Sequence, residues 1–405
     1  MGFLDIFEIL LWLFLGLFAA FYLIYYALMV HESRKPNNVQ REKKILDVTL
    51  LIPMYNEAKV IRRKILNVEN LDYPKKNLEV IIIDSGSIDG TPDLVQHYID
   101  KSKIRYKLIV QPDRLGKASA INYALRYCKG DIIVMTDADA LFNKDALKKI
   151  VENFSDPNVG SATGRICILN ADQSSVTVLE KSYRTIFEII RQGESKMDST
   201  PIFNGPITAF RKELFDELET DTVTDDIEIC IRIREKGFRS VYDPEAIAYE
   251  NTPISRKSRI KQKTRRAHGA IQSIIRHKNL LFNRKYGRYG FIIFPCEFFL
   301  HLISPFMLLL IILLGGVVTL RVLSSTLPFT TVVLLSVGVL ILFTFILQTL
   351  KLDRLLVINP VNVLFTFFDS QLCLILGFVA LLMRKKDYKW EKIEDVRLVT
   401  NGDII

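Results

Sequence analysis

Long apolar stretches near both ends of the chain enclose a central region in which apolar and polar residues alternate over shorter runs. Each stretch has about 20 or more residues with few charges, the length that a helix needs to cross a bilayer. The sequence therefore predicts an integral membrane protein with a globular domain inserted between spans. The first stretch lacks a small-residue cleavage site, so we expect a retained anchor. The four stretches are Phe7–Val30, Leu302–Val322, Pro328–Leu350 and Leu355–Met383.

Within the central region, four short apolar runs alternate with segments of helical character. The run Val80–Ile83 is continuously apolar, which is typical of a parallel strand buried on both faces. This β-α-β-α order predicts an α/β fold whose parallel sheet binds a nucleotide at the carboxyl ends of its strands. The predicted strands are Leu46–Pro53, Leu78–Asp84, Tyr106–Val110 and Asp131–Thr136.

Two later segments have helical periodicity. Residues 174–194 place Leu179, Ile186 and Ile190 on one face, with basic residues between them. That face fits either packing in the core or docking on the membrane interface. A second, strongly basic helix is predicted to begin near Ser255.

Charge and cysteine content narrow the class of protein. The 405-residue chain has a formal net charge of +9, but its Lys and Arg residues gather beside the apolar stretches, at 34–44 and 254–278. Basic residues beside spans mark the cytoplasmic face, so we predict a cytoplasmic central domain and no nucleic-acid binding. The five cysteines show no paired spacing, which predicts neither a disulfide framework nor a zinc site.

These patterns divide the chain into five segments. We expect an anchor at 1–33, a cytoplasmic α/β domain at 45–253, a basic interfacial segment at 254–288, a membrane region at 289–385 and a tail at 386–405. Three spans after the domain would leave the basic residues at 384–386 outside the cytoplasm, whereas basic residues beside spans are expected on the cytoplasmic side. An extra crossing within 288–323 or in the stretch containing Pro360, or a re-entrant stretch, would restore agreement, and the crossing number stays open.

Polar residues stand where the predicted strands end. The strongest signal is Asp137-Ala-Asp139, a pair of carboxylates that follows a buried strand. Carboxylate oxygens are ligands for Mg²⁺ or Mn²⁺ together with substrate phosphates. Tyr55 and Glu57 follow the first strand, Asp84 ends the second and Lys117 follows the third. Together they predict a site for a nucleotide diphosphate at one sheet edge.

This ordered series resembles the inverting family-2 glycosyltransferases of the GT-A fold, especially membrane-bound members such as hyaluronan, cellulose and poly-N-acetylglucosamine synthases. The resemblance implies that Tyr55 and Glu57 face the nucleobase and ribose and that Asp84 hydrogen-bonds the base. It further implies that Lys117 contacts the ribose or phosphates. Asp137 would hold the ribose or the donor sugar, and Asp139 would bind the metal.

The resemblance continues downstream. Gly205, in Asn204-Gly-Pro, matches the segment under the acceptor, and the family's Thr-Glu-Asp is Thr224-Asp-Asp226 here. The resemblance thus makes Asp226 the catalytic base and places Asp225 where the family has Glu.

The family's Gln-X-X-Arg-Trp appears in this chain as Gln262-Lys-Thr-Arg-Arg266. Gln262 and Arg265 would lie on one helical face near the donor. Arg266 replaces a Trp that stacks on the acceptor sugar in polymerising relatives. An arginine there offers charge and hydrogen bonds instead, which suits a phosphate-bearing lipid acceptor.

These features predict a membrane enzyme that transfers a sugar from a nucleotide donor, for which we expect UDP, to a lipid or a growing polysaccharide. Single transfer to a lipid and processive synthesis with translocation both remain open. A non-catalytic membrane scaffold that binds nucleotide sugars is a third possibility, although no expected carboxylate is missing.

Overall fold

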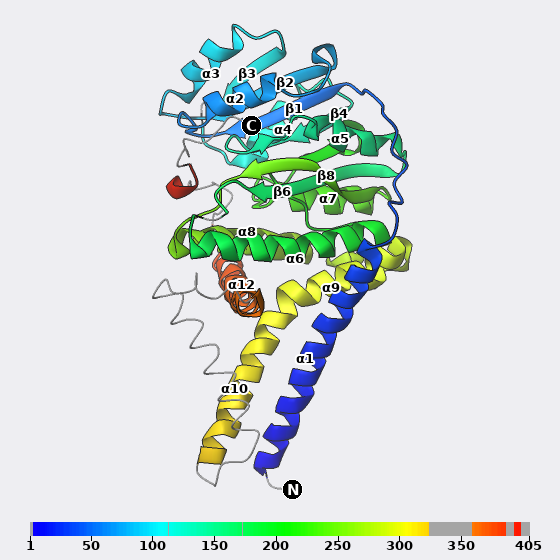
Figure 1. The fold of residues 1–405 in the computed structure, drawn as a ribbon, viewed down its shortest axis with the longest axis vertical. Coiled ribbons are helices and arrows are strands. Elements are labelled where there is room, and N and C mark those ends of the chain that lie inside the picture. Colours follow the sequence, from blue (N-terminus) through cyan, green and yellow to red (C-terminus); the bar gives the residue numbers. More distant parts are fainter. Residues whose placement is uncertain (1–2, 112, 172, 324–358, 386–392, 398–405) are drawn as a thin grey trace.

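The computed structural model describes residues 3–111, 113–171, 173–323, 359–385 and 393–397. An α/β domain stands at one end of the molecule, and long helices extend from its base (Figure 1). The predicted span Pro328–Leu350 lies outside the described residues, as does most of the predicted tail at 386–405.

The domain is built on one eight-stranded sheet in the order β3-β2-β1-β4-β7-β6-β8-β5. The four predicted strands are confirmed as its parallel half. They are β1 (Val48–Met54), β2 (Leu78–Ser85), β3 (Arg105–Gln111) and β4 (Ile132–Met135). In the other half β7 runs antiparallel to both β4 and β6, whereas β6 and β8 are parallel. These strands are β5 (Leu141–Phe142), β6 (Val159–Ile168), β7 (Thr208–Arg211) and β8 (Arg239–Glu250).

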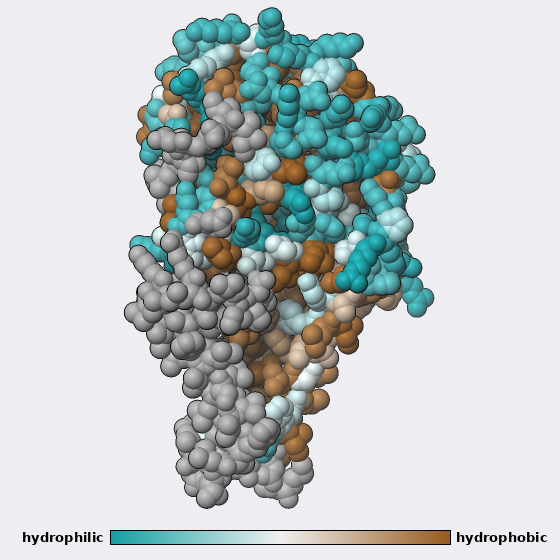
Figure 2. All heavy atoms as spheres, in the orientation of Figure 1, coloured by the Kyte–Doolittle hydropathy of each residue, from teal (hydrophilic) through white to brown (hydrophobic). Residues whose placement is uncertain are grey.

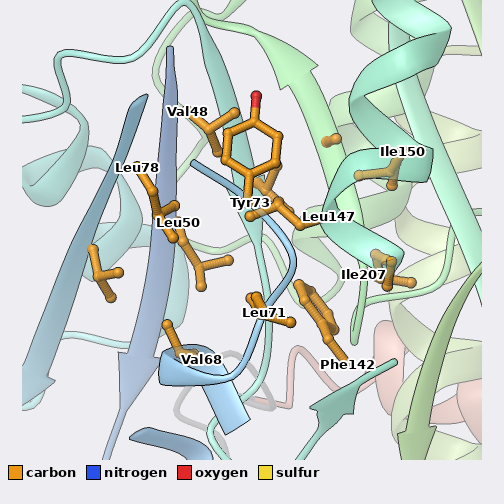
Figure 3. Packing of buried hydrophobic residues seen from close by; sticks show 14 of the residues in the cluster. Val48, Leu50, Val68, Leu71, Tyr73, Leu78, Phe142, Leu147, Ile150 and Ile207 are labelled. Carbon is orange, nitrogen blue, oxygen red and sulfur yellow. The ribbon is translucent and has the colours of Figure 1, made fainter. Parts of the chain in front are cut away.

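Helices cover both faces of the sheet because alternate strand residues point to opposite sides. Leu50 and Val80 pack on one side against α2 (Ile61–Glu69), α3 (Thr91–Ile99) and α5 (Ala146–Glu152), and Figure 3 shows part of this core. Leu51 and Ile81 pack on the other side against α4 (Lys117–Leu125) and α7 (Asp225–Glu235). Each fully buried aliphatic side chain contributes roughly 1.5–3 kcal/mol, so the strands are fixed and their carboxyl ends share one edge.

Two amphipathic helices lie between the sheet and the long helices (Figure 1). They are α6 (Ser175–Met197), which begins with a capping box at Ser174 and Thr177, and α8 (Arg256–Arg276), which is capped by Ser255. Leu179 and Ile190 of α6 are buried within the protein, so its apolar face serves core packing, one of the two alternatives left open by the sequence.

Among the described residues, three helices are long and apolar enough to cross a membrane: Ile6–Ser33, Tyr289–Thr319 and Leu364–Leu382. They belong to α1 (Phe3–Ser33), to a run ending in α10 (Ser304–Leu323), and to α12 (Asn359–Leu382). Their apolar side chains gather below the hydrophilic domain in Figure 2. Apolar helices at both ends of the chain are consistent with three of the four predicted membrane spans.

The helical run of the second candidate span begins at residue 289, where the predicted membrane region starts and before the apolar stretch at Leu302. The helical run starts at Tyr289 and passes through α9 (Phe294–Phe298), which is flanked by π-helical turns η6 (Tyr289–Ile293) and η7 (Phe299–Ile303). Glu297 and His301 interrupt the hydropathy, but they pair with each other inside the protein, with His301 Nδ1 3.1 Å from Glu297 Oε2. Residues 289–323 therefore form one helical run and not two crossings.

Glycines seat the long helices against the domain. A Cβ on Gly193 of α6 would stand 2.5 Å from the Met29 carbonyl oxygen of α1, and one on Gly377 of α12 would stand 2.7 Å from the His268 amide nitrogen of α8. Only a residue without a side chain permits these approaches. The amphipathic layer and the spans therefore form one packed unit.

Candidate active site

The polar residues predicted from the strand ends meet at the carboxyl edge of the parallel half of the sheet. A hollow there is lined by Pro53, Met54, Tyr55, Ser85, Arg114, Gly116, Lys117 and Ala120. The Arg114 guanidinium lies over the Tyr55 ring, 4.2 Å from its centroid. This cation–π pair gives the hollow a flat, basic wall that suits a nucleobase and its phosphates.

The loop after β2 is shaped by Asp84. This buried carboxylate accepts hydrogen bonds from the backbone amide of Ser87, at 2.9 Å, and from its hydroxyl. Asn56, with a left-handed φ of 53°, joins this loop to the one after β1. Its backbone N–H donates to Ser87 Oγ, and its side-chain Oδ1 accepts from the backbone N–H of Ile88. Asp84 thus reaches the predicted place and also orders the loop around it.

Asp139 is the predicted metal ligand. Burial raises the pKa of Asp139 above its usual range and neighbouring Asp137 adds to the rise, while the Arg397 guanidinium, with Nη2 3.7 Å from Asp139 Oδ2, opposes it. No cage of three or more His, Cys, Asp or Glu occurs among the described residues. A divalent ion held by Asp139 would therefore complete its shell with substrate oxygens and water, as Mg²⁺ ordinarily does.

A buried lysine that no sequence motif marks holds this loop in place. Lys64 of α2 donates to Thr136 Oγ1 and to the Ala140 carbonyl oxygen, both at 2.7 Å, on either side of the two aspartates. Burial lowers the pKa of Lys64 to about 7. Its position in the helix is the sequence signal that could have revealed its burial, since Lys64 shares the face of α2 that carries Ile61 and Ile65.

Lys117 connects the loop after β4 to the start of α7. Its Nζ lies 2.9 Å from Asp137 Oδ1 and 3.2 Å from Asp225 Oδ1. Burial raises the pKa of Asp137, but the Lys117 ammonium outweighs it and holds that pKa below its usual range. Asp137 is therefore charged and fixed, while Asp225 Oδ2 is buried without a hydrogen-bond partner in the described part of the chain.

Asp226 lies in the first turn of α7, and its carboxylate and that of Asp137 both come close to Gly205. A Cβ built on Gly205 would be 3.4 Å from Asp226 Oδ2 and 3.8 Å from Asp137 Oδ2. Burial, and then the negative charge of Asp225, raise the pKa of Asp226 to about 6. A carboxyl group with this pKa is ionised near neutral pH and can accept a proton.

The basic helix α8 forms the side of the site nearest the spans. Gly269 lets it approach α7, because a Cβ there would lie 2.3 Å from Thr224 Cγ2. One turn earlier, Arg265 stands in the field of Asp137, Asp225 and Asp226. Arg266 is 40% exposed, with Nη2 3.6 Å from Glu250 Oε1, and Gln262 lies one turn before Arg265.

A residue of the predicted tail also reaches the site. Arg397 forms a bidentate ion pair with Glu57, in which Nε is 2.7 Å from Oε2 and Nη2 is 2.5 Å from Oε1. Nothing in the sequence pointed to Arg397, since it lies more than 100 residues beyond the other motifs and carries no motif itself.

Comparison with known proteins decides what kind of domain this is. Residues 49–219 match the family described as glycosyl transferase family 2. The chain carries a family-2 glycosyltransferase domain. The poly-β-1,6-N-acetyl-D-glucosamine synthase of Staphylococcus aureus strain COL is 29% identical over 233 residues, 56% of each protein. The probable glycosyltransferase YdaM of Bacillus subtilis strain 168 is 29% identical over 273 residues, 66% of this chain and 65% of YdaM.

A solved structure matches nearly the whole chain. The mannosyltransferase PcManGT from Pyrobaculum calidifontis, in complex with GDP-Man and Mn²⁺, superposes with a TM-score of 0.76 at 27% identity, covering 94% of this chain and 99% of PcManGT. These comparisons confirm the predicted family and GT-A fold. The match spans little more than half of the staphylococcal synthase. The roles of individual residues in the family-2 domain stay predictions.

Proposed function

We propose that the protein is an inverting, metal-dependent glycosyltransferase that moves a sugar from a nucleoside-diphosphate donor to a membrane lipid. The observation that carries this proposal is that the carboxylates of Asp226 and Asp137 both come close to Gly205. Asp137 would hold the donor sugar, and Asp226 would take the proton of an acceptor hydroxyl as its oxygen attacks the anomeric carbon. One displacement then inverts the configuration at that carbon.

Charge around the leaving group supports the same reaction. The diphosphate leaves with its negative charge as the bond between the anomeric carbon and the phosphate oxygen breaks, and Lys117 and Arg265, which both interact with Asp137, would stabilise that charge. A Mg²⁺ or Mn²⁺ ion at Asp139 would supply further charge stabilisation to the diphosphate when bound. PcManGT is described with GDP-Man and Mn²⁺, which supports a divalent ion in this chain as well.

We infer a lipid acceptor from the residues on the side of the site nearest the spans. Arg266 replaces the family's stacking Trp and is half-exposed beside Glu250, so this position offers charge where polymerising relatives offer an aromatic face. Helix α8, which carries Arg266, packs directly on α12. An acceptor held in the membrane with an anionic headgroup fits such a position. Processive polysaccharide synthesis is the second candidate, favoured by the similarity to the poly-N-acetylglucosamine synthase.

A donor screen tests the proposal. Purified protein in lipid nanodiscs would be given UDP- and GDP-linked sugars, with Mn²⁺ or with EDTA, and nucleotide release would be measured. The sequence favours UDP, whereas PcManGT makes GDP the competing nucleotide. We expect release with one nucleotide class only in the presence of the metal and a lipid extract. Long chains among the radiolabelled products would show polymer synthesis and not single transfer. No nucleotide release with any donor would contradict the proposed function.

The proposed orientation places the domain in the cytoplasm, because basic residues follow the first span at Arg34, Lys35 and Arg41. Protease added to intact spheroplasts should leave the domain uncut, whereas protease added to inverted vesicles should digest it.

A further inference from the structure

Helix α12, a candidate membrane span, carries a single charged side chain, Asp369. This carboxylate is 4% exposed, and its Oδ2 accepts a hydrogen bond from Nη1 of Arg259 in α8, which is 2% exposed. An ionisable residue inside a span is costly, and such residues are ordinarily paired and functional. A buried ion pair is weak evidence for stability, because apolar side chains of similar volume often pack as well. A role other than stability is therefore expected of this pair.

Helices α8 and α12 lie side by side, with α12 beneath the amphipathic layer in Figure 1. The Arg256 guanidinium is 5.6 Å from the centroid of the Phe365 ring, and a Cβ on Gly377 would be 2.7 Å from the His268 backbone nitrogen. The contacts follow the same order along both helices, and the ion pair lies between them. Because a helix rises only about 1.5 Å per residue, a small slide of α8 along α12 would break this directional bond. The pair thus sets the register between the two helices.

Helix α12 is itself held in place on its other side. The side-chain nitrogen of Gln371 donates to the Tyr22 hydroxyl of α1 at 2.9 Å, and the Ser304 hydroxyl of α10 donates to Gln371 Oε1 at 3.1 Å. These hydrogen bonds join α12 to both of the other candidate spans. Asp369 therefore projects from a fixed helix, and α8 is positioned against it.

Glu180 of α6 cannot take over the role of Asp369, because it is shared among several cations. Its Oε2 lies 3.2 Å from Arg259 Nε and 3.2 Å from Lys263 Nζ, and its Oε1 lies 3.5 Å from Arg184 Nε. Burial raises the pKa of Glu180, but Lys263, Arg184 and Arg259 outweigh it and hold that pKa well below its usual range. Without Asp369, Arg259 would keep only this shared carboxylate, and α8 would lose its polar tie to α12.

The same helix carries a cation to the proposed donor site. Arg265 follows Arg259 by six residues, roughly 9 Å along the axis of α8. It stands in the field of Asp137, Asp225 and Asp226. A hydrogen-bonded helix is stiff over this length, so a displacement of α8 at Arg259 would also displace the guanidinium of Arg265.

We propose that Asp369 is a positioning residue for donor binding: its ion pair with Arg259 fixes helix α8 so that Arg265 reaches the donor diphosphate. The inference rests on the proposed function and extends it, because a polar residue of a candidate span becomes part of what sets donor affinity. Asp369 touches no substrate and acts through Arg259 and Arg265.

Binding of nucleotides of different phosphate content tests this assignment. Isothermal titration of the full-length protein in nanodiscs, with Mn²⁺, would compare UDP with UMP and GDP with GMP. Arg265→Gln is the reference, and because hydrogen bonds to charged groups are strong it should weaken diphosphate binding about tenfold or more. Asp369→Asn should weaken diphosphate binding about fivefold or more and monophosphate binding less than about twofold, because the shift of Arg265 affects only the diphosphate contact. Asp369→Glu, which keeps the charge, should lose less.

A double variant separates positioning from stability. Arg259→Met/Asp369→Leu replaces both buried charges by apolar side chains, an exchange that is often neutral or stabilising. It should melt near the temperature of the unaltered protein and still bind the diphosphate weakly, because the directional bond is gone. The matched control is Ser370→Ala, at the next position of α12, whose hydroxyl donates within its own helix to the Thr366 carbonyl oxygen at 2.7 Å. This control should leave both affinities unchanged.

Equal losses of diphosphate and monophosphate affinity in Asp369→Asn would show general destabilisation and overturn the proposal. Recovery of diphosphate affinity together with melting temperature in the double variant would show a packing role alone and overturn it as well. Unchanged binding in Asp369→Asn, with a loss in Arg265→Gln, would remove the role of Asp369 and leave the proposed function standing. Unchanged binding in Arg265→Gln would remove both residues from donor binding. Failure of the unaltered protein to bind any nucleoside diphosphate would instead overturn the proposed function itself.

Discussion

Gly205→Ala probes the space between the two carboxylates that carry the proposed chemistry. The added methyl would stand 3.4 Å from Asp226 Oδ2 and 3.8 Å from Asp137 Oδ2, which are ordinary contacts, so the fold should accept it. Gly205 does not have a left-handed φ, so alanine introduces no backbone strain. In the proposed mechanism, the methyl would enter the space beside both carboxylates that the acceptor oxygen and the anomeric carbon need.

The size of the effect follows from that geometry. Reacting atoms must come within about 3–3.5 Å, and a displacement of about 1 Å costs roughly a hundredfold in rate. We therefore expect kcat/KM of Gly205→Ala to fall about a hundredfold or more, with nucleoside-diphosphate affinity within about twofold, because the Tyr55 hollow is untouched. The assay is nucleotide release with donor and acceptor, paired with calorimetric titration of the nucleotide.

A matched control comes from a candidate membrane span. Gly316→Ala on α10 also adds one methyl at a glycine, and a Cβ there meets nothing within 4 Å. It should keep full activity. Unchanged turnover in Gly205→Ala would refute the reasoning, because the reaction would then take place elsewhere; lost nucleotide binding would show that Gly205 serves the fold or the donor site.

The remaining predictions concern proton transfer, metal binding and loop position. Because Asp226 must be ionised to act and its pKa is about 6, activity should decline as pH falls through 6. Asp225→Asn removes a negative neighbour and should therefore shift this acidic limb of the pH–activity profile to lower pH. An acidic limb that does not shift would show that it does not report the titration of Asp226. Asp139→Asn should weaken Mn²⁺-dependent nucleotide binding by about tenfold or more, the strength of one charged contact, while metal-free binding stays the same; equal affinity with Mn²⁺ would remove Asp139 as ligand. Lys64→Met should lower the melting temperature and raise the Mn²⁺ concentration needed for half activity, because Thr136 and Ala140 lose their shared donor; a change in neither would show that the loop holds itself.

The strand ends were predictable from sequence for a physical reason. Strands buried on both faces must be continuously apolar, so Val80–Ile83 stands out, and the residue after such a run is fixed at the ligand edge of the sheet. Asp84 and Asp139 could therefore be placed at that edge from their positions in the chain alone. The second half of the sheet could not, because β5 has two residues and β7 four, and their pairing depends on tertiary contacts.

Lys64 and Arg397 could not be predicted from the sequence, for a different physical reason. Lys64 and Arg397 act through partners distant in sequence, and neither lies in a local motif that signals a buried charge. The apolar stretch beginning at Leu302 did not include residues 289–301 because Glu297 lowers the hydropathy there, and its ion pair with His301 is visible only in the packed helix. Burial of a paired charge is a tertiary property, and local pattern carries little information about it.

Asp226→Asn tests the central claim most directly. Rates of nucleotide release and donor affinity would be measured on one preparation in nanodiscs, with donor, Mn²⁺ and lipid acceptor. The side chain keeps its shape and loses the ability to accept a proton, so the account predicts a rate loss of about 10²–10⁴-fold with nucleotide affinity nearly unchanged. Transfer at the unaltered rate in Asp226→Asn would contradict Asp226 as the base, and with it the proposed mechanism.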